Sequence, residues 1–164
     1  MPEVAWWLLA LVTAMTGIAI LLWRPAQRAA REARLTTAKR NFHRQRERLE
    51  ARFIQLAAAQ AKADAPRWMD CDFDDAVAYV RNRATGELSA FVAVTVAMES
   101  LSDPLTHSAS DLIGNLRAGT AVFRFDRDHW ETDGRAILNL SPNEAIRFYQ
   151  HDLEVVGQEL AQHS

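Results

Sequence analysis

The chain has 164 residues, close to the length of one common domain. Its single cysteine excludes an intrachain disulfide and favours a reducing compartment, and no Cys/His spacing of the zinc type is present. The net charge of −2 conceals an asymmetry: residues 24–62 carry 11 Lys/Arg and 3 Glu, a net charge of +8, whereas residues 63–164 carry 8 Arg and 17 Asp/Glu, a net charge of −9. Each segment therefore needs its own interpretation.

Residues 4–23 form an uncharged run of 20 residues after a short tail, residues 1–3. As a helix this run would be about 30 Å long, which matches the hydrocarbon core of a bilayer. Trp6 and Trp7 lie at one end and Trp23 at the other, where indole rings suit the membrane interface. The sequence therefore predicts one transmembrane helix. The alternatives are a buried helix of a soluble core and a cleaved signal peptide, although no basic region precedes the run.

Basic residues follow the apolar run. Arg24, Arg28 and Arg31 are the first of six Lys/Arg within about 20 residues of its end. The positive-inside rule then places the N-terminus outside and the residues after Arg24 in the cytoplasm. These arginines would also attract anionic lipid headgroups. Nucleic-acid binding is less favoured, because no aromatic platform or helix-turn-helix pattern accompanies them.

Residues 24–62 are predicted to form a basic helical arm, because residues 26–62 contain no Pro or Gly and are rich in helix formers. Pro25 would either kink this helix or begin it. One seam of a coiled coil repeats every seven residues, with a poor companion seam: Leu35, Phe42, Leu49 and Leu56. For the second half of the arm, we favour the alternative that Leu49, Phe53 and Leu56 dock onto a globular domain.

Residues 63–164 are predicted to form a small soluble α+β domain. Strand patterns cover 76–83, 87–99, 120–125 and 129–132, with a loop over 100–119. Residues 67–71 form either a short strand or the entry into the sheet, and residues 136–140 either continue the strand before them or start a fifth. The strand at 87–99 is apolar on both faces, which is typical of a central strand. Hairpin-length connections predict an antiparallel sheet of four or five strands. By analogy alone, this order is similar to cystatin-like or nuclear-transport-factor-like folds.

The clearest local signal is the capping box Ser141-Pro142-Asn143-Glu144, which predicts the start of a C-terminal helix. Apolar residues at helical spacing extend that prediction over Ile146, Tyr149, Leu153, Val156 and Leu160. We expect this helix to cover the sheet, with the end of the basic arm as a second cover.

Two groups of acidic residues are candidate cation sites. Asp70, Asp72 and Asp74 match the first ligands of a calcium loop, but Asp75 stands where Gly is required and Arg81 where the bidentate Glu belongs. The second group surrounds a turn: Asp126, Asp128, His129, Glu131 and Asp133. Because turns are naturally rich in Asp, we favour a structural role for it.

No catalytic motif is present, and we expect no metal or cofactor. Cys71 would form a thiol–imidazole pair with His129 or His151 only if the fold brought them together. G-x-S-x-G, Walker A and G-x-G-x-x-G patterns do not occur.

Three stretches resemble uncharacterised membrane-anchored bacterial proteins: CDFDDAVAYVRNRATGEL, NLRAGTAVFRFD and WETDGRAILNLSPNEAIRFYQHDLE. The resemblance extends over about residues 42–153 and implies a membrane anchor but no activity.

The sequence therefore favours a non-enzymatic, membrane-tethered cytoplasmic module that binds a protein partner or itself. The alternatives are an enzyme or small-ligand binder with a pocket between sheet and helix, and an oligomeric membrane scaffold assembled through the arm.

Overall fold

The computed structural model describes residues 2–60, 68–98 and 116–161, although few side chains are described within residues 2–28. The chain divides into two compact units, Met1–Arg40 and Asn41–Ser164. A single helix, α1 (Pro2–Gln60), contributes to both, and it continues through residue 25 without a break. In the first unit the hydroxyl groups of Thr36 and Thr37 donate to the carbonyl groups of Glu32 and Ala33, one helical turn earlier.

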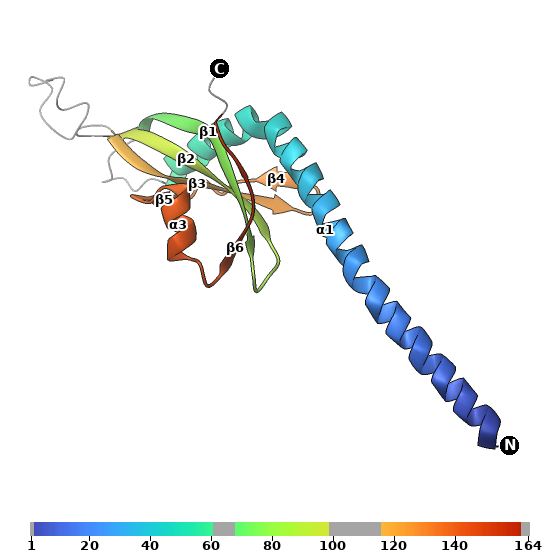
Figure 1. Ribbon diagram of the computed structural model, residues 1–164. Helices are drawn as coiled ribbons and strands as arrows, with labels where there is room; N and C mark the ends of the chain where they lie inside the picture. The colour runs from blue at the N-terminus through green and yellow to red at the C-terminus, as the bar shows by residue number, and fades with distance from the viewer. Residues whose placement is uncertain (1, 61–67, 99–115, 162–164) are drawn as a thin grey trace, which may run out of the picture. The chain divides into compact units, whose positions relative to one another are not determined.

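The second unit is built on an antiparallel sheet (Figure 1). Its strands in the described residues are β1 (Trp68–Asn82), β2 (Leu88–Met98), β3 (Leu116–Asp126), β4 (His129–Glu131), β5 (Ala136–Leu138) and β6 (Leu153–Glu159). The order is β4-β3-β2-β1-β6, and β5 pairs with β3 beyond the end of β4. The α+β class and the antiparallel sheet are confirmed, with six strands described rather than four or five.

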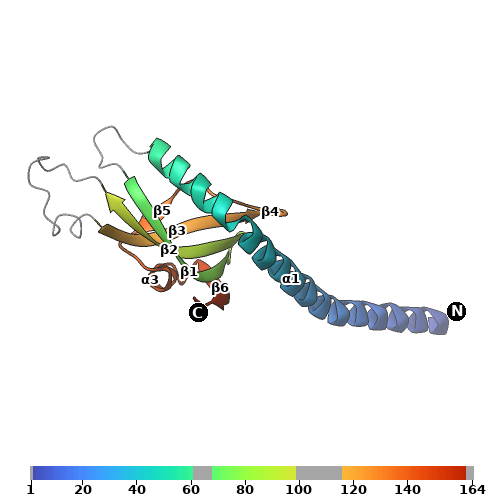
Figure 2. The same ribbon diagram turned by 90° about the horizontal axis from the view of Figure 1, so that it is seen from above.

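The second half of α1 covers one face of the sheet (Figure 2). Phe42 and Phe53 are 1% and 0% exposed. The Phe42 ring lies 5.5 Å from that of Phe123 and 5.1 Å from that of Trp130, and the Phe53 ring lies 5.6 Å from that of Phe73. The expected docking of the arm onto the domain is therefore observed. The heptad residues Phe42 and Leu49 are therefore buried in the core of their own chain.

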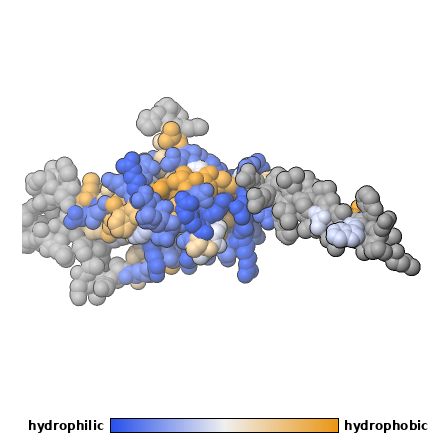
Figure 3. Space-filling view, turned by 60° about the horizontal axis from the view of Figure 1, so that its bottom comes forward, coloured by the Kyte–Doolittle hydropathy of each residue, from blue (hydrophilic) through white to orange (hydrophobic). Residues whose placement is uncertain are grey.

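The opposite face is covered by the short helix α3 (Pro142–Phe148). Ala145 of α3 packs with Ala78, Val80 and Phe91, and apolar residues of neighbouring strands close the cluster. On the face seen in Figure 3, the described surface of this unit is mainly hydrophilic, with apolar areas between the hydrophilic ones. Its exposed large apolar side chains include Phe148, Tyr149, Val155 and Leu160.

The predicted C-terminal helix is wrong beyond its first two turns. α3 ends at Phe148, and Leu153–Glu159 forms the edge strand β6 beside β1. The segments predicted as separate strands at 67–71 and 76–83 are one strand, β1, in which a bulge between Phe73 and Val77 interrupts the pairing with β2. The central position of β2 is confirmed, since β1 and β3 pair with its two edges. Most of the predicted loop 100–119 lies outside the described residues.

Within the residues whose side chains the structure describes, no helix has a stretch long and apolar enough to cross a membrane. The backbone of residues 4–23 is helical, but most of their side chains lie outside the described residues. The predicted transmembrane helix thus stays a prediction.

Candidate functional site

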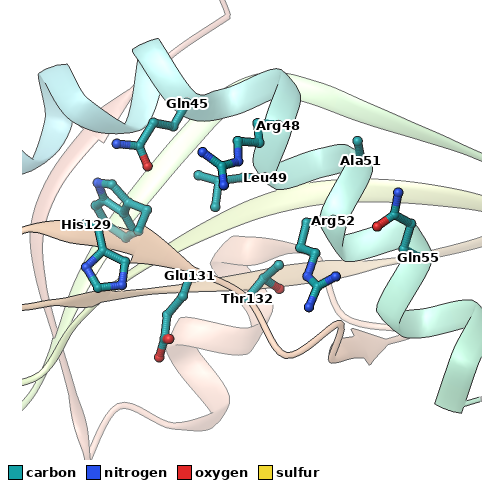
Figure 4. Close-up of a pocket in the computed structure, with 10 residues that line it drawn as sticks. Gln45, Arg48, Leu49, Ala51, Arg52, Gln55, His129, Glu131 and Thr132 are labelled. Carbon is teal, nitrogen blue, oxygen red and sulfur yellow. The ribbon is translucent and has the colours of Figure 1, made fainter.

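An open groove of about 780 Å³ lies between α1 and β4 in the second unit. One wall consists of α1 side chains, among them Gln45, Arg48, Arg52 and Gln55, and the other wall is the stretch from His129 to Thr132 (Figure 4). Leu49 and Trp130 also line the groove and are buried, so they belong to its floor.

The groove keeps its width because α1 is tied to the β4 segment at two points. The amide of Asn41 donates to the carbonyl oxygen of Asp128 at 3.4 Å, and that of Gln60 donates to the carbonyl oxygen of Asp133 at 2.5 Å. Next to the second contact, Gly134 approaches α1 so closely that a Cβ atom there would lie 2.7 Å from the nitrogen of Ala57. These contacts hold the two walls next to each other at both ends of the groove.

The groove carries unneutralised positive charge. The side chains of Arg48 and Arg52 are exposed, and they form no ion pair or hydrogen bond within the described part of the chain. The nearby Glu131 has its own partner, since its carboxylate lies 3.5 Å from Arg124. Two guanidinium groups, each with several N–H donors, are thus available to an anion.

His129 supplies the imidazole of β4, a group that can donate or accept a proton. Its Nδ1 lies 3.1 Å from a carboxylate oxygen of Asp128, and this hydrogen bond lowers the pKa of the Asp128 carboxyl. Both side chains are exposed, so the pair is well solvated. The Thr132 hydroxyl is already engaged, since it donates to the carbonyl of Val122 at 3.2 Å and accepts from the N–H of Gly134 at 3.1 Å. The described lining therefore supplies charge for binding but no activated nucleophile.

The acidic turn group does not converge on a point. Arg135 pairs with Asp133 at 3.4 Å, while Glu131 and Asp128 face other partners. Among the described residues, no three His, Cys, Asp or Glu side chains are arranged to hold a metal ion.

The aspartates of the first acidic group lie along β1 and its bulge. The carboxylate of Asp70 accepts from the N–H of Cys71 at 2.9 Å, and that of Asp74 accepts from the N–H of Ala76 at 3.0 Å. Asp75 lies 3.5 Å from Arg46. These carboxylates satisfy local backbone and cationic groups, so the calcium-loop geometry is not formed.

Cys71 is half-buried in β1, and within the described part of the chain its thiol makes no hydrogen bond to His129 or His151. Burial, and secondly the charge of Asp70, raise the pKa of its thiol to about 11. A thiol with that pKa is almost entirely protonated at neutral pH, which makes it a poor nucleophile.

On the other flank of α1, the side chains of His43 and Arg46 have carboxylate partners. His43 Nε2 lies 2.7 Å from the Glu159 carboxylate of β6, which also accepts from the Tyr79 hydroxyl at 3.1 Å. Burial, followed by the charge of Glu159, raises the pKa of Tyr79. Arg46 pairs with Glu50 at 2.7 Å and donates to the carbonyl groups of the β1 bulge. This flank fastens the helix to the sheet.

The remaining predicted residues are helix-cap and membrane-interface residues. Ser141 caps α3: it accepts from the Glu144 N–H, and the Glu144 carboxylate accepts from the Ser141 N–H at 2.8 Å. Among the interface residues, Trp6 and Arg31 are exposed, while the side chains of Trp7, Trp23, Arg24 and Arg28 lie outside the described residues.

A pocket between sheet and helix was one alternative from the sequence, and His129 was a candidate residue, but the arginines of this groove were not singled out as ligand-binding residues. The sequence offered one signal: Arg44, Arg48 and Arg52 recur every four residues, a spacing that places all three along one side of a helix. No protein-family model, curated protein or solved structure matches this chain.

Proposed function

We propose that this protein is a membrane-tethered interaction module whose groove between α1 and β4 binds an acidic segment of a partner protein. The observation that carries this proposal is the presence of two exposed arginines, Arg48 and Arg52, in a rigid groove without counter-ions among the described residues. Guanidinium groups in fixed positions recognise carboxylates by charge-assisted hydrogen bonds.

The groove suits binding better than catalysis. Its volume, about 780 Å³, lies within the range of ligand-binding sites. Its hydroxyl group, on Thr132, is engaged by backbone groups, and its histidine faces an exposed aspartate. An acyl-transfer or hydrolytic mechanism would need a nucleophile within reach of a base, and the described lining offers none.

The tether is proposed from the first unit. The uncharged residues 4–23 have the length of a bilayer span, and the described apolar side chains there are exposed: Trp6, Leu11 and Met15. Apolar side chains without a protein cover are stabilised in lipid. The arginines that follow this run would orient the helix with its C-terminal end on the cytoplasmic side, which would place the second unit in the cytoplasm.

Fractionation tests the tether. The full-length protein should remain in the membrane pellet after alkaline carbonate extraction, and a reporter fused to its C-terminus should be active only in the cytoplasm. Recovery of the protein in the carbonate supernatant would contradict the tether, and an active reporter outside the cytoplasm would contradict the orientation.

Peptide binding tests the groove. Full-length protein in neutral detergent is titrated against fluorescent peptides rich in glutamate, and binding is followed by anisotropy. We expect the double variant R48E/R52E to lose at least about tenfold in affinity, because each charge-assisted hydrogen bond contributes roughly 1.5–3 kcal/mol. The matched control is the double variant R83E/R117E, which makes the same charge change at two exposed arginines outside the groove. Equal losses in the two variants would refute the site.

A further inference from the structure

We infer that a second copy of this chain docks on the α3 face of the second unit, with the two α3 helices antiparallel and the Phe148 ring of each copy in an apolar pocket beside the start of the other α3. This face lies on the opposite side of the sheet from α1 (Figure 2). The inference therefore does not depend on the ligand of the groove between α1 and β4.

The first observation is a pair of exposed aromatic rings at the C-terminal end of α3. Phe148 is 70% exposed and Tyr149 is 39% exposed. Their ring centroids lie 4.9 Å apart in an edge-to-face arrangement, so the two rings form one patch. This patch leaves roughly 200 Å² of aromatic surface per copy in contact with solvent. Contiguous apolar surface of this kind commonly marks a site of protein contact.

The second observation is a pocket of about 260 Å³ at the other end of the same helix. The polar side chains that line it have partners within the chain: Asn143 accepts from Gln158 at 3.4 Å, and Asp74 accepts from the N–H of Ala76 at 3.0 Å. The pocket is smaller than the sites of about 300–1,000 Å³ that hold drug-sized ligands, and its size suits one apolar side chain. Its apolar lining comes mainly from small residues: Ala76, Ala78, Ala93, Pro142 and Leu160.

The symmetry of a dimer brings the rings and the pocket together. α3 extends from Pro142 to Phe148, which is about 9 Å along a helix axis. The Phe148 ring therefore cannot fill the pocket of its own copy, which lies at the opposite end of the helix. In an antiparallel pair, however, the last residue of each helix lies opposite the first residue of the other. Both copies use the same surface, so the contact closes at two chains.

The charges on α3 favour the same antiparallel arrangement. With the dimer axis between Ala145 and Ile146, the exposed Glu144 of each copy lies opposite the exposed Arg147 of the other. Ser141 donates its N–H and its hydroxyl to one oxygen of Glu144, Oε2, so Oε1 can accept from a guanidinium group. Arg147 forms no ion pair within the described part of the chain. Two ion pairs would thus form across the axis.

A lipid surface suits this face less well than a second copy. Residues 141–160 carry one arginine against four acidic residues, a net charge of −3. Anionic headgroups attract basic segments, so they would repel this one. A second copy places a positive charge opposite a negative one and fills the pocket, and a membrane does neither.

The size of the patch predicts a weak dimer. A standard interface covers about 800 Å² on each partner, whereas the aromatic pair supplies only roughly 200 Å². We therefore expect dimers to form and dissociate readily in dilute detergent. Chains confined to one membrane would associate more, because confinement raises their local concentration.

Photochemical cross-linking tests the contact of a single side chain. Full-length protein in neutral detergent carries the photoreactive amino acid benzoyl-phenylalanine in place of Phe148, and a control carries it in place of Leu116, which is 47% exposed and lies outside the patch. Covalent dimers are quantified on a denaturing gel, and the cross-linked peptides are identified by mass spectrometry. We expect at least about fivefold more dimer from position 148, attached to residues 141–143 or 158–160 of the second copy.

Charge reversal tests the antiparallel arrangement. R147E places two carboxylates opposite each other at both ion pairs, and E144R places two guanidinium groups there. Each variant, with the photoreactive residue at position 148 and at low ionic strength, should lose at least about fivefold of the covalent dimer. A mixture of the two variants, with tags of different length, should regain the mixed dimer because both of its ion pairs have opposite charges. A variant that had merely lost the cap or the fold of α3 would not be rescued in this way.

Three results would overturn the inference. The first is an equal yield of dimer from positions 148 and 116, or cross-links to other segments of the second copy. The second is a mixture of R147E and E144R that dimerises as poorly as each variant alone. The third is an adduct with detergent or lipid in place of the dimer, which would show that the rings contact the membrane.

Discussion

The close approach of Gly134 to α1 makes the docking of helix and sheet testable with one methyl group. Gly134 has φ +74°, and a Cβ atom there would lie 2.7 Å from the nitrogen of Ala57 and 2.7 Å from Cβ of Leu56. Two of the three nearest atoms are helix backbone, which cannot rotate away. The substitution Gly134→Ala must therefore separate α1 from the loop after β4 or strain both.

Gly86 provides the matched control. It also has φ +74°, but a Cβ atom there would meet nothing within 4 Å. The left-handed conformation alone costs an alanine about 1–2 kcal/mol, and both variants bear that cost. Forcing an extra carbon into a packed contact costs roughly 1–3 kcal/mol more. We therefore expect Gly86→Ala to lower the free energy of unfolding by about 1–2 kcal/mol and Gly134→Ala by about 2–5 kcal/mol.

Urea unfolding of the two variants, followed by tryptophan fluorescence and by circular dichroism, measures the difference. Coincident transitions from the two probes would justify a two-state comparison. If Gly134→Ala and Gly86→Ala are destabilised equally, within about 0.5 kcal/mol, the helix does not approach the loop as described. If helix and loop are in contact as described, Gly134→Ala should also weaken binding of the acidic peptide, because the contact lies at one end of the groove. Without that contact, the variant should bind the peptide normally.

Three further predictions concern other parts of the second unit. Phe53→Ala should cost about 3–5 kcal/mol in urea unfolding because the ring is fully buried, whereas Phe148→Ala, at a side chain that is 70% exposed, should stay within about 0.5 kcal/mol. Ser141→Ala should cost about 1 kcal/mol by the same measurement, since it removes the cap of α3. Cys71 should react with iodoacetamide at pH 8 at least about tenfold more slowly in the native than in the urea-unfolded protein, because its pKa of about 11 leaves little thiolate. Equal rates would contradict its half-buried position.

Local patterns predicted those parts of the fold whose physics is local. The strand over 87–99 was recognisable because both of its faces are apolar, and a strand with neighbours on both edges needs that. The turn at Gly86 was recognisable because only glycine takes positive φ at little cost, and its φ is +74°. The docking of Leu49 and Phe53 followed from apolar residues at helical spacing on an otherwise basic arm.

The error at the C-terminus has a clear physical source. Leu153, Val156 and Leu160 are spaced by three and four residues, which suits a helix, but they follow a single capping box that fixes only the first turn. After Tyr149, the backbone N–H groups of Asp152 and Leu153 donate to the Tyr149 carbonyl and reverse the chain. Beyond the reversal, β6 pairs with the outer edge of β1, and its β-branched Val155 lies opposite Val80. Tertiary pairing decided the structure.

The candidate site could not be predicted because it depends on long-range placement. Arg48 and Arg52 lie about 80 residues from His129 and Thr132 in the chain, and nothing in the sequence fixes which flank of α1 faces β4. The aspartate-rich stretches were the candidate sites from the sequence instead, because clustered carboxylates can be recognised without knowing the fold. In the structure they lie in a strand, a bulge and a turn, where they satisfy neighbouring groups.

The exposure of the groove limits how tightly an acidic partner can bind. The two exposed arginines contribute about 1.5–3 kcal/mol each before screening by salt, and the polar side chains of Gln45 and Gln55 about 0.5–1.5 kcal/mol each. Association itself costs at least about 4 kcal/mol, so the net free energy of binding is at most about 5 kcal/mol and the expected dissociation constant is about a tenth of a millimolar or weaker. So weak an interaction is useful only when the partner is kept nearby. Confinement of both proteins to one membrane would supply that local concentration, so the proposed tether and the proposed ligand of the groove would serve a common purpose.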